Sequence, residues 1–172
     1  ENRKLFAQLV GAKETEIALV SGTSLGLNQI SQLIPLKPGD NVIINDMEYV
    51  SNVLVWLKLQ KKGIEVRFAK NREGVVSAHD VESLADKNTK VISVSNPGWY
   101  NGYLHDLRHL GEIVHRNGGY LVVDGIQGCG AMRVDVKRDG VDFYVAGTHK
   151  KILGPFSVAF LYIREDLIDL LE

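Results

Sequence analysis

The sequence predicts an α/β fold in three layers, with a mainly parallel sheet of seven strands and helices on both faces. Seven short apolar segments are separated by stretches in which apolar residues recur with helical spacing. Three of the segments, NVIIN, KVISVS and YLVVD, are rich in valine or isoleucine, which is typical of strands covered on both faces. Alternation of strands with helices favours a parallel sheet, because each helix carries the chain back across it.

The predicted strands are distributed along the whole chain. They are Ile17 to Val20, Asn41 to Asn45, Glu65 to Ala69, Val91 to Ser95, Tyr120 to Asp124, Asp142 to Ala146 and Val158 to Ile163. Turn residues agree with these limits, since KPGD precedes the second strand and NGG precedes the fifth. The last strand follows its predecessor after a loop with Gly154 and Pro155 and without a helix, so we expect it to be antiparallel.

Helices are predicted between strands and at both ends of the chain. Helical spacing is clearest in two apolar sets, Leu25, Ile30, Leu33 and Ile34, and Leu107, Leu110, Ile113 and Val114. The N-terminal stretch and the final EDLIDLLE are also amphipathic. Each of these two helices would need a partner to cover its apolar side.

The composition predicts one domain over residues 1–172, because 172 residues with 45% apolar content fill one core but not two. A net charge of −1 without a basic tract argues against nucleic acid as a partner. No apolar run approaches the roughly 20 residues that span a bilayer, so no membrane partner is expected. A single cysteine excludes an internal disulfide, and we expect a cytoplasmic protein.

An acid and an amine each follow a predicted buried strand: Asp124 ends YLVVD, and Lys150 follows FYVAGTH. Parallel strands would bring both side chains to one edge of the sheet. A pyridoxal phosphate site needs this pair, because a lysine forms a Schiff base with the cofactor aldehyde and a carboxylate keeps the ring nitrogen protonated. Taken singly, the two residues are also compatible with a surface lysine and a strand-end cap.

Small residues open the helix after the first strand, where Ser21, Gly22, Thr23 and Ser24 stand in sequence. Such residues let the backbone approach an anion, and the free amide groups at the start of a helix point toward it. The segment is therefore a candidate phosphate cradle, with an ordinary helix cap as the alternative. It is neither a Walker loop nor a GxGxxG fingerprint.

Four more residues are candidate contacts at the same edge of the sheet. The ring of Tyr49, after the second strand, could stack on a flat cofactor. Asn96 follows the fourth strand, Gln127 could donate its amide to a ring oxygen, and His149 could pack against the cofactor. Each of the four is also compatible with an ordinary core or loop position.

The strings GTSLGLNQI, NDMEYVSNV, VVDGIQ and AGTHKKILGPF carry a family resemblance. From about Leu5 to about Ile163 the chain resembles the class V aminotransferases of fold type I, which include cysteine desulfurases and isopenicillin N epimerase-like proteins. The resemblance implies a pyridoxal 5′-phosphate cofactor held as an internal aldimine on Lys150, with Asp124 at the pyridine nitrogen and Gln127 at the phenolic oxygen. It further implies a phosphate grip by Thr23 and Ser24, Asn96 near the substrate or cofactor, and a homodimer.

Three departures from the family pattern stand out. Tyr49 replaces the histidine of cysteine desulfurases, which argues against desulfuration because a phenol cannot transfer protons as an imidazole does near neutral pH. Gly147 replaces a phosphate-binding serine of many relatives, and Thr148 is the candidate substitute. The chain also lacks the family's N-terminal arm and stops before its small C-terminal domain, so we expect only the large domain.

The sequence therefore predicts a pyridoxal-phosphate-dependent enzyme that acts on a small amino-acid substrate, of the aminotransferase or carbon-sulfur lyase type. In such an enzyme Lys150 would move the Cα proton as general base and acid, while Asp124 stays ionised. Two other classes stay open. One is a truncated, non-catalytic module that binds the cofactor, and the other is a nucleotide-binding α/β domain that uses the loop from Ser21 to Ser24.

No metal site is predicted. His105 and His109 are four residues apart on a predicted helix, yet no carboxylate or cysteine on the same element would complete a tetrahedral zinc set. Cys129 is close to Gln127 in sequence, but we expect it to be a small buried residue and not a nucleophile.

Overall fold

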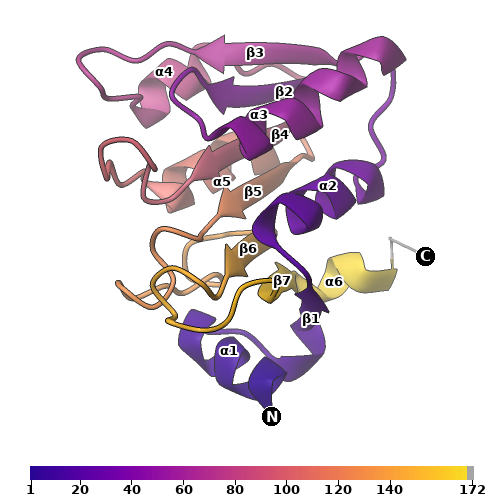
Figure 1. Ribbon diagram of the computed structural model, residues 1–172. Coiled ribbons are helices and arrows are strands. Elements are labelled where there is room, and N and C mark those ends of the chain that lie inside the picture. Colours follow the sequence, from indigo (N-terminus) through magenta and orange to yellow (C-terminus); the bar gives the residue numbers. More distant parts are fainter. Residues whose placement is uncertain (170–172) are drawn as a thin grey trace.

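The computed structural model describes residues 1–169 and contains the predicted sheet (Figure 1). Its seven strands lie in the order β1-β7-β6-β5-β4-β2-β3. Their bounds are β1 Ile17–Val20, β2 Asn41–Asn45, β3 Glu65–Ala69, β4 Thr89–Ser95, β5 Tyr120–Asp124, β6 Phe143–Gly147 and β7 Ala159–Ile163. All seven predicted strands are confirmed, with ends that differ from the prediction by two residues or fewer.

Strand directions also follow the prediction. β3, β2, β4, β5 and β6 pair in parallel, whereas β7 pairs antiparallel with both β6 and β1. The register places Ser95 of β4 beside Asp124 of β5, and Asp124 beside Val145 of β6. Because β1 runs in the same direction as these parallel strands, the carboxyl ends of six strands, all except β7, lie at one edge of the sheet.

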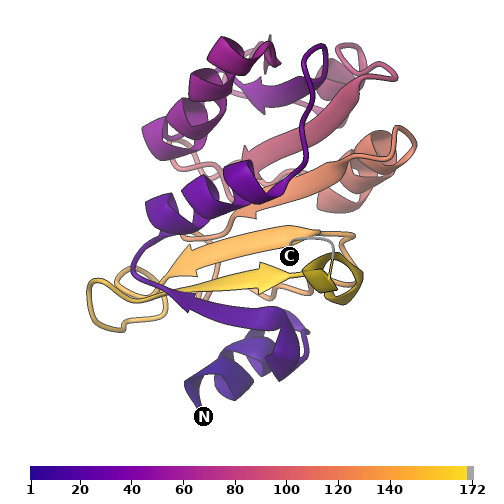
Figure 2. The ribbon, with the colours of Figure 1, turned by 90° about the vertical axis from the view of Figure 1, so that its right-hand side faces the viewer.

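Helices cover both faces of the sheet and make three layers (Figure 2). The α-helices are α1 Asn2–Val10, α2 Thr23–Leu33, α3 Val50–Leu57, α4 Ala78–Glu82, α5 Leu107–His115 and α6 Glu165–Ile168, with short 3-10 helices η1 Glu14–Glu16 and η2 Lys58–Lys62. Apolar residues of α2, α3 and α6 share one core cluster, and those of α1, α4 and α5 share the other. The sheet therefore separates two cores, as its apolar strands predict.

The helices at the two ends of the chain pack against parts of the fold that the sequence did not indicate. Phe6 of α1 stacks on Phe160 of β7, with ring centroids 4.4 Å apart. Leu167 of α6 is buried in the core cluster of α2 and α3. The last part of the predicted EDLIDLLE helix, residues 170–172, lies outside the described residues. Among residues 1–169, no helix combines the length and the apolar character that a membrane crossing requires.

Candidate functional site

A cavity of about 210 Å³ opens at the carboxyl edge of the sheet. Loops that follow five strands, β1, β2, β4, β5 and β6, supply its walls. The lining residues are Gly22, Thr23, Ser24, Tyr49, Ser51, Ser95, Trp99, Asp124, Ile126, Gln127, His149 and Lys150. Seven of the nine site residues predicted from the sequence are among them: Thr23, Ser24, Tyr49, Asp124, Gln127, His149 and Lys150.

The start of α2 forms one wall of the cavity. Gly22 precedes the helix, and Thr23 and Ser24 are its first residues. The Thr23 hydroxyl is buried and has no hydrogen-bond partner in the structure. A buried hydroxyl without a partner costs free energy, because it loses its bonds to water and gains none. This wall therefore offers an unused donor beside the free amide groups of a helix start.

Gly147, at the end of β6, lies directly beneath that hydroxyl. A Cβ atom built on Gly147 would lie 3.0 Å from Thr23 Oγ1 and 3.1 Å from Ile126 Cδ1. A serine here, as in many relatives of the resembled family, would therefore require Thr23 or Ile126 to move. The Thr23 hydroxyl is one of the tight contacts that a side chain at position 147 would meet.

Asp124 ends β5 and has only 1% of its surface exposed. Its Oδ1 accepts a hydrogen bond of 3.1 Å from the amide of Ile126. Burial raises the pKa of Asp124 to about 7, and the charge of Glu48 adds to the rise, while the Ile126 amide and the charge of Lys150 oppose it. A cation beside this carboxylate would restore its ionised form, because opposite charge favours ionisation.

Lys150 follows β6 by three residues and lines the same cavity as Asp124. Its Nζ lies 5.7 Å from the centroid of the Tyr49 ring, within the range of a cation–π contact. The cavity is thus lined by both an amine and a buried carboxyl group. The structure brings the predicted pair together at one edge of the sheet.

Aromatic side chains line the same cavity as this pair. Tyr49 directly precedes α3 and meets Trp99 edge to face, with ring centroids 5.4 Å apart. His149 stacks on Phe156 with centroids 5.0 Å apart and an interplanar angle of 19°. The imidazole of His149 therefore has a ring partner in the loop between β6 and β7.

Two predicted contacts lie outside the cavity. Asn96 is buried, and its side-chain oxygen accepts the amide of His105 at 2.9 Å, so that it holds the loop after β4. The Thr148 hydroxyl donates within the loop before β7, to the carbonyls of Pro155 at 2.5 Å and Val158 at 3.1 Å. Neither side chain lines the cavity, so the structure gives no support to a cofactor contact by Asn96 or to a phosphate contact by Thr148.

The sequence did not single out Glu48, which lies just behind the cavity. Its carboxylate is buried and accepts four hydrogen bonds, from the Ser95 amide at 2.7 Å, the Ser95 hydroxyl at 2.6 Å, and the side chains of Asn45 and Asn52 at 2.6 and 3.0 Å. Ser95 in turn lines the cavity. The spacing of four between Glu48 and Asn52 is a weak helical signal, but the contact with Ser95 spans 47 residues. No sequence pattern would have revealed it.

The two histidines weighed as zinc ligands do not share a helix, which corrects the prediction. α5 begins at Leu107 with Asp106 as its cap, so His105 precedes it and only His109 lies on it. Within residues 1–169, no three His, Cys, Asp or Glu side chains gather as a set that would hold a metal ion. Cys129 is buried as expected, and burial raises the pKa of its thiol to about 11.

Comparison with known proteins places this arrangement in a family. The chain matches the family Aminotransferase class-V over residues 1–172. It belongs to the class V aminotransferases. A probable cysteine desulfurase of Methanothermobacter thermautotrophicus is 34% identical, over 100% of this chain and 43% of that protein. An uncharacterized aminotransferase of Bacillus subtilis is 32% identical, over 99% of this chain and 45% of that protein.

A solved structure agrees with the family assignment. The apo structure of a cysteine desulfurase from Thermococcus onnurineus NA1 superposes with a TM-score of 0.92 at 33% identity, over 99% of this chain and 43% of that one. This class V aminotransferase chain thus spans less than half the length of the relatives it matches. Pyridoxal 5′-phosphate is the cofactor of the family.

Proposed function

We propose that this chain is the cofactor-binding large domain of a pyridoxal-phosphate-dependent enzyme that acts on an amino acid, as an aminotransferase or a carbon-sulfur lyase. One observation carries the proposal. A single cavity is lined by the amine of Lys150, the carboxyl group of Asp124 and the start of α2, which come from the ends of three different strands. The homodimer and the cytoplasmic location stay predictions.

The residues that line the cavity fit the cofactor in two ways: some of their polar groups lack a hydrogen-bond partner, and their charges complement those of the cofactor. The unpartnered Thr23 hydroxyl and the Ser24 hydroxyl, at the start of α2, suit a phosphate group. The raised pKa of Asp124 marks a buried carboxyl group whose ionised form lacks a cation, which a protonated pyridine ring would supply. The cavity of about 210 Å³ is smaller than the roughly 300–1,000 Å³ of sites for drug-sized ligands, which favours a small ligand.

When bound, pyridoxal 5′-phosphate supplies an aldehyde that bonds to amines and a protonated ring that withdraws electrons from the substrate's Cα. In the proposed site Lys150 would hold the cofactor through Nζ and would move the proton at the substrate's Cα. Asp124 would hold a proton on the ring nitrogen, and Thr23 and Ser24 would bind the phosphate. Tyr49 would contact the ring, and Gln127 would donate its amide to the phenolic oxygen.

Desulfuration of cysteine is the second candidate. It is favoured by the matched relatives that are named cysteine desulfurases. Against it stands Tyr49, which lines the cavity at the position where cysteine desulfurases, by the resemblance, carry a histidine. With dithiothreitol as the reductant, desulfuration converts cysteine to alanine and sulfide, whereas a lyase gives pyruvate, ammonia and sulfide, and an aminotransferase moves the amino group to an oxo acid. Formation of alanine from cysteine therefore distinguishes desulfuration from the first candidate.

The test is to mix the chain with pyridoxal 5′-phosphate, record its absorption, reduce it with borohydride and map the modified lysine. We expect a new absorption band and a single modified residue, Lys150. Lys150→Ala should abolish the band. Lys151→Ala is the matched control, because Lys151 is the exposed neighbour of Lys150 and lies outside the cavity, and this variant should keep the band.

Two results would contradict the proposal. Modification spread over surface lysines, with equal labelling of the Lys150→Ala variant, would show that the reaction is not site-directed. Tight binding of a nucleotide instead of the cofactor would favour the nucleotide-binding alternative.

A third result would contradict only the catalytic part of the proposal. If Lys150 is labelled but amino acids leave the spectrum unchanged, the chain is a non-catalytic binding module.

A further inference from the structure

The loop after β4 places two exposed aromatic side chains beside the cavity. Trp99 lines the cavity with 44% of its surface exposed, and Tyr100 is 72% exposed. Trp99 meets Tyr49 edge to face at 5.4 Å and meets Tyr100 in the same way at 5.8 Å. The three rings therefore form a continuous row that begins beside Lys150 and ends at the surface.

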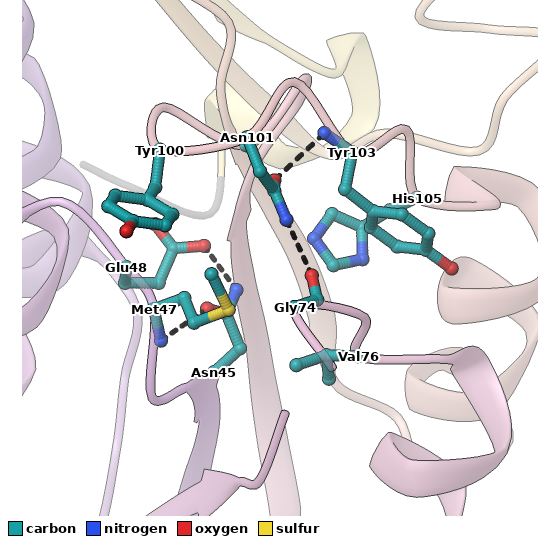
Figure 3. A pocket seen from close by; sticks show the side chains of 10 residues that line it. Asn45, Met47, Glu48, Gly74, Val76, Tyr100, Asn101, Tyr103 and His105 are labelled. Atoms are coloured by element: carbon teal, nitrogen blue, oxygen red, sulfur yellow. Dashed lines mark hydrogen bonds between the residues drawn. The ribbon is translucent and has the colours of Figure 1, made fainter. Parts of the chain in front are cut away.

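The loop is held in place by bonds from its own polar groups. Figure 3 shows Asn101 between the loop and the segment at Gly74, where its amide nitrogen donates to the Gly74 carbonyl at 2.5 Å and its oxygen accepts the Tyr103 amide at 3.0 Å. The amide of Gly98 also donates to the Tyr103 carbonyl at 2.8 Å. A loop tied at both ends presents its aromatic rings at fixed positions, which lowers the cost of ordering them on binding.

Trp99 itself is anchored by its polar atom. Its indole nitrogen donates to the carbonyl of Met47 at 2.8 Å, so the hydrogen-bonding end of the side chain is occupied. What Trp99 offers to a ligand is therefore its apolar ring surface. The same ring forms a wall of a second hollow of about 230 Å³, which Met47, Tyr100, Asp46 and Glu48 complete.

The two charged residues that line this second hollow, Asp46 and Glu48, are both acidic. Glu48 is buried among its four donors, and Asp46 accepts from Asn71 and lies 3.7 Å from Lys70. No arginine lines either hollow in the part of the chain that the structure describes. A negatively charged substrate side chain would meet carboxylates here, whereas an aromatic one would meet two rings and a thioether.

We propose that Trp99 and Tyr100 form a side-chain pocket that selects amino acids with aromatic or large apolar side chains over small or acidic ones. The inference rests on the proposed function and names the substrate class of that site. In this arrangement the Cα of the substrate would lie near Lys150, and its side chain would contact the Trp99 ring, which lines both hollows. An aromatic pair contributes roughly 0.5–1.5 kcal/mol beyond area burial, which corresponds to an affinity gain of about 2- to 13-fold.

The experiment uses stable conjugates made by reducing the adduct of pyridoxal 5′-phosphate with phenylalanine, alanine or aspartate. Each conjugate is titrated calorimetrically into the cofactor-free chain, so that no turnover is needed. We expect the phenylalanine conjugate to bind about ten-fold more tightly than the alanine conjugate, and the aspartate conjugate to bind no better than alanine.

Variants test the origin of the preference. Trp99→Ala should remove most of the difference between phenylalanine and alanine, whereas Trp99→Phe, which keeps a ring, should retain it. Leu104→Ala is the matched control, since Leu104 is an exposed apolar residue near the same loop that lines neither hollow, and it should change nothing. Circular dichroism and thermal melting establish that each variant is folded.

The outcomes separate this inference from the function on which it rests. If the alanine conjugate binds and the phenylalanine conjugate binds no more tightly, the aromatic pocket is wrong and the proposed function stands. A preference for the aspartate conjugate, or an unchanged preference in Trp99→Ala, overturns it as well. If no conjugate binds and no cofactor is trapped on Lys150, the proposed function fails and the inference fails with it.

Discussion

Two buried aspartates on neighbouring strands show what distinguishes the two edges of the sheet. Asp142 stands just before β6, is fully buried, and binds the Leu121 amide at 2.6 Å, His115 Nε2 at 2.8 Å and the guanidinium of Arg164. Asp124 ends β5, is equally buried, and accepts the Ile126 amide at 3.1 Å. Asp142 is enclosed by donors, whereas Asp124 faces a cavity.

The difference teaches that burial of a charged residue does not by itself indicate a site. Asp142 joins β6 to α5 and to the end of β7, and its bonding is complete within the fold. The Asp124 side chain accepts one hydrogen bond, and the Thr23 hydroxyl makes none. Both residues line the same cavity. Unused capacity around a cavity is what a ligand would satisfy, and three substitutions test that distinction.

The largest effect is expected at Asp142. Asp142→Ala leaves the buried Leu121 amide unpaired and removes the carboxylate that Arg164 and His115 share, so the free energy of unfolding should fall by about 3 kcal/mol. Urea-induced unfolding measures it. Asp166→Ala is the matched control, because Asp166 binds the same arginine from an exposed position and should cost less than about 1 kcal/mol. Equal losses from the two substitutions would contradict the comparison.

A smaller effect with a defined pH dependence is expected at the cavity. The pKa of Asp124 is about 7 in the folded protein, above the value of about 3.9 in an unfolded chain, so the folded state binds the proton more tightly. Without cofactor, the free energy of unfolding should therefore fall as the pH rises from about 4 to about 7 and then level off. Above about pH 7 the folded protein holds Asp124 as a buried, ionised carboxylate, which lowers the free energy of unfolding.

Asp124→Asn removes this titration while it keeps the shape of the side chain. The variant should be more stable than the wild type at about pH 8 and gain much less at about pH 5, although it should lose the cofactor. Urea unfolding of both proteins at the two pH values measures the difference. A difference in stability between variant and wild type that is the same at both pH values would show that Asp124 does not titrate in this range.

The smallest effect separates stability from binding at Thr23. Thr23→Val replaces a buried, unpartnered hydroxyl with a methyl group, so the cofactor-free chain should gain about 1 kcal/mol while its affinity for the cofactor falls. Thr89→Val is the matched control at the start of β4, because the Thr89 hydroxyl donates to Asn41 and accepts the Asp86 amide, both at 2.8 Å. It should lose stability by about 1–3 kcal/mol. A loss of stability in both variants would mean that Thr23 has a partner after all.

Much of the fold and of the site could be predicted because both depend on where strands end. Asp124 ends one apolar run and Lys150 follows another, both runs are typical of buried strands, and parallel strands bring such positions to one edge. The predicted cofactor contacts of Asn96 and Thr148 have no support from the structure, because the direction of a loop side chain depends on local partners that the sequence does not reveal. Asn96 turns to the His105 amide, and Thr148 turns to the loop before β7.

The sequence by itself determined the strands, the antiparallel entry of β7 and the two groups at the centre of the candidate site. These features follow from local patterns, since apolar runs and turn residues act over a few positions. Only the tertiary structure decided that Glu48 binds Ser95, that Gly147 lies beneath the unpartnered hydroxyl of Thr23, and that Trp99 borders the cavity. Those contacts join segments that are far apart in the chain, and the order of strands in the sheet sets which of them meet.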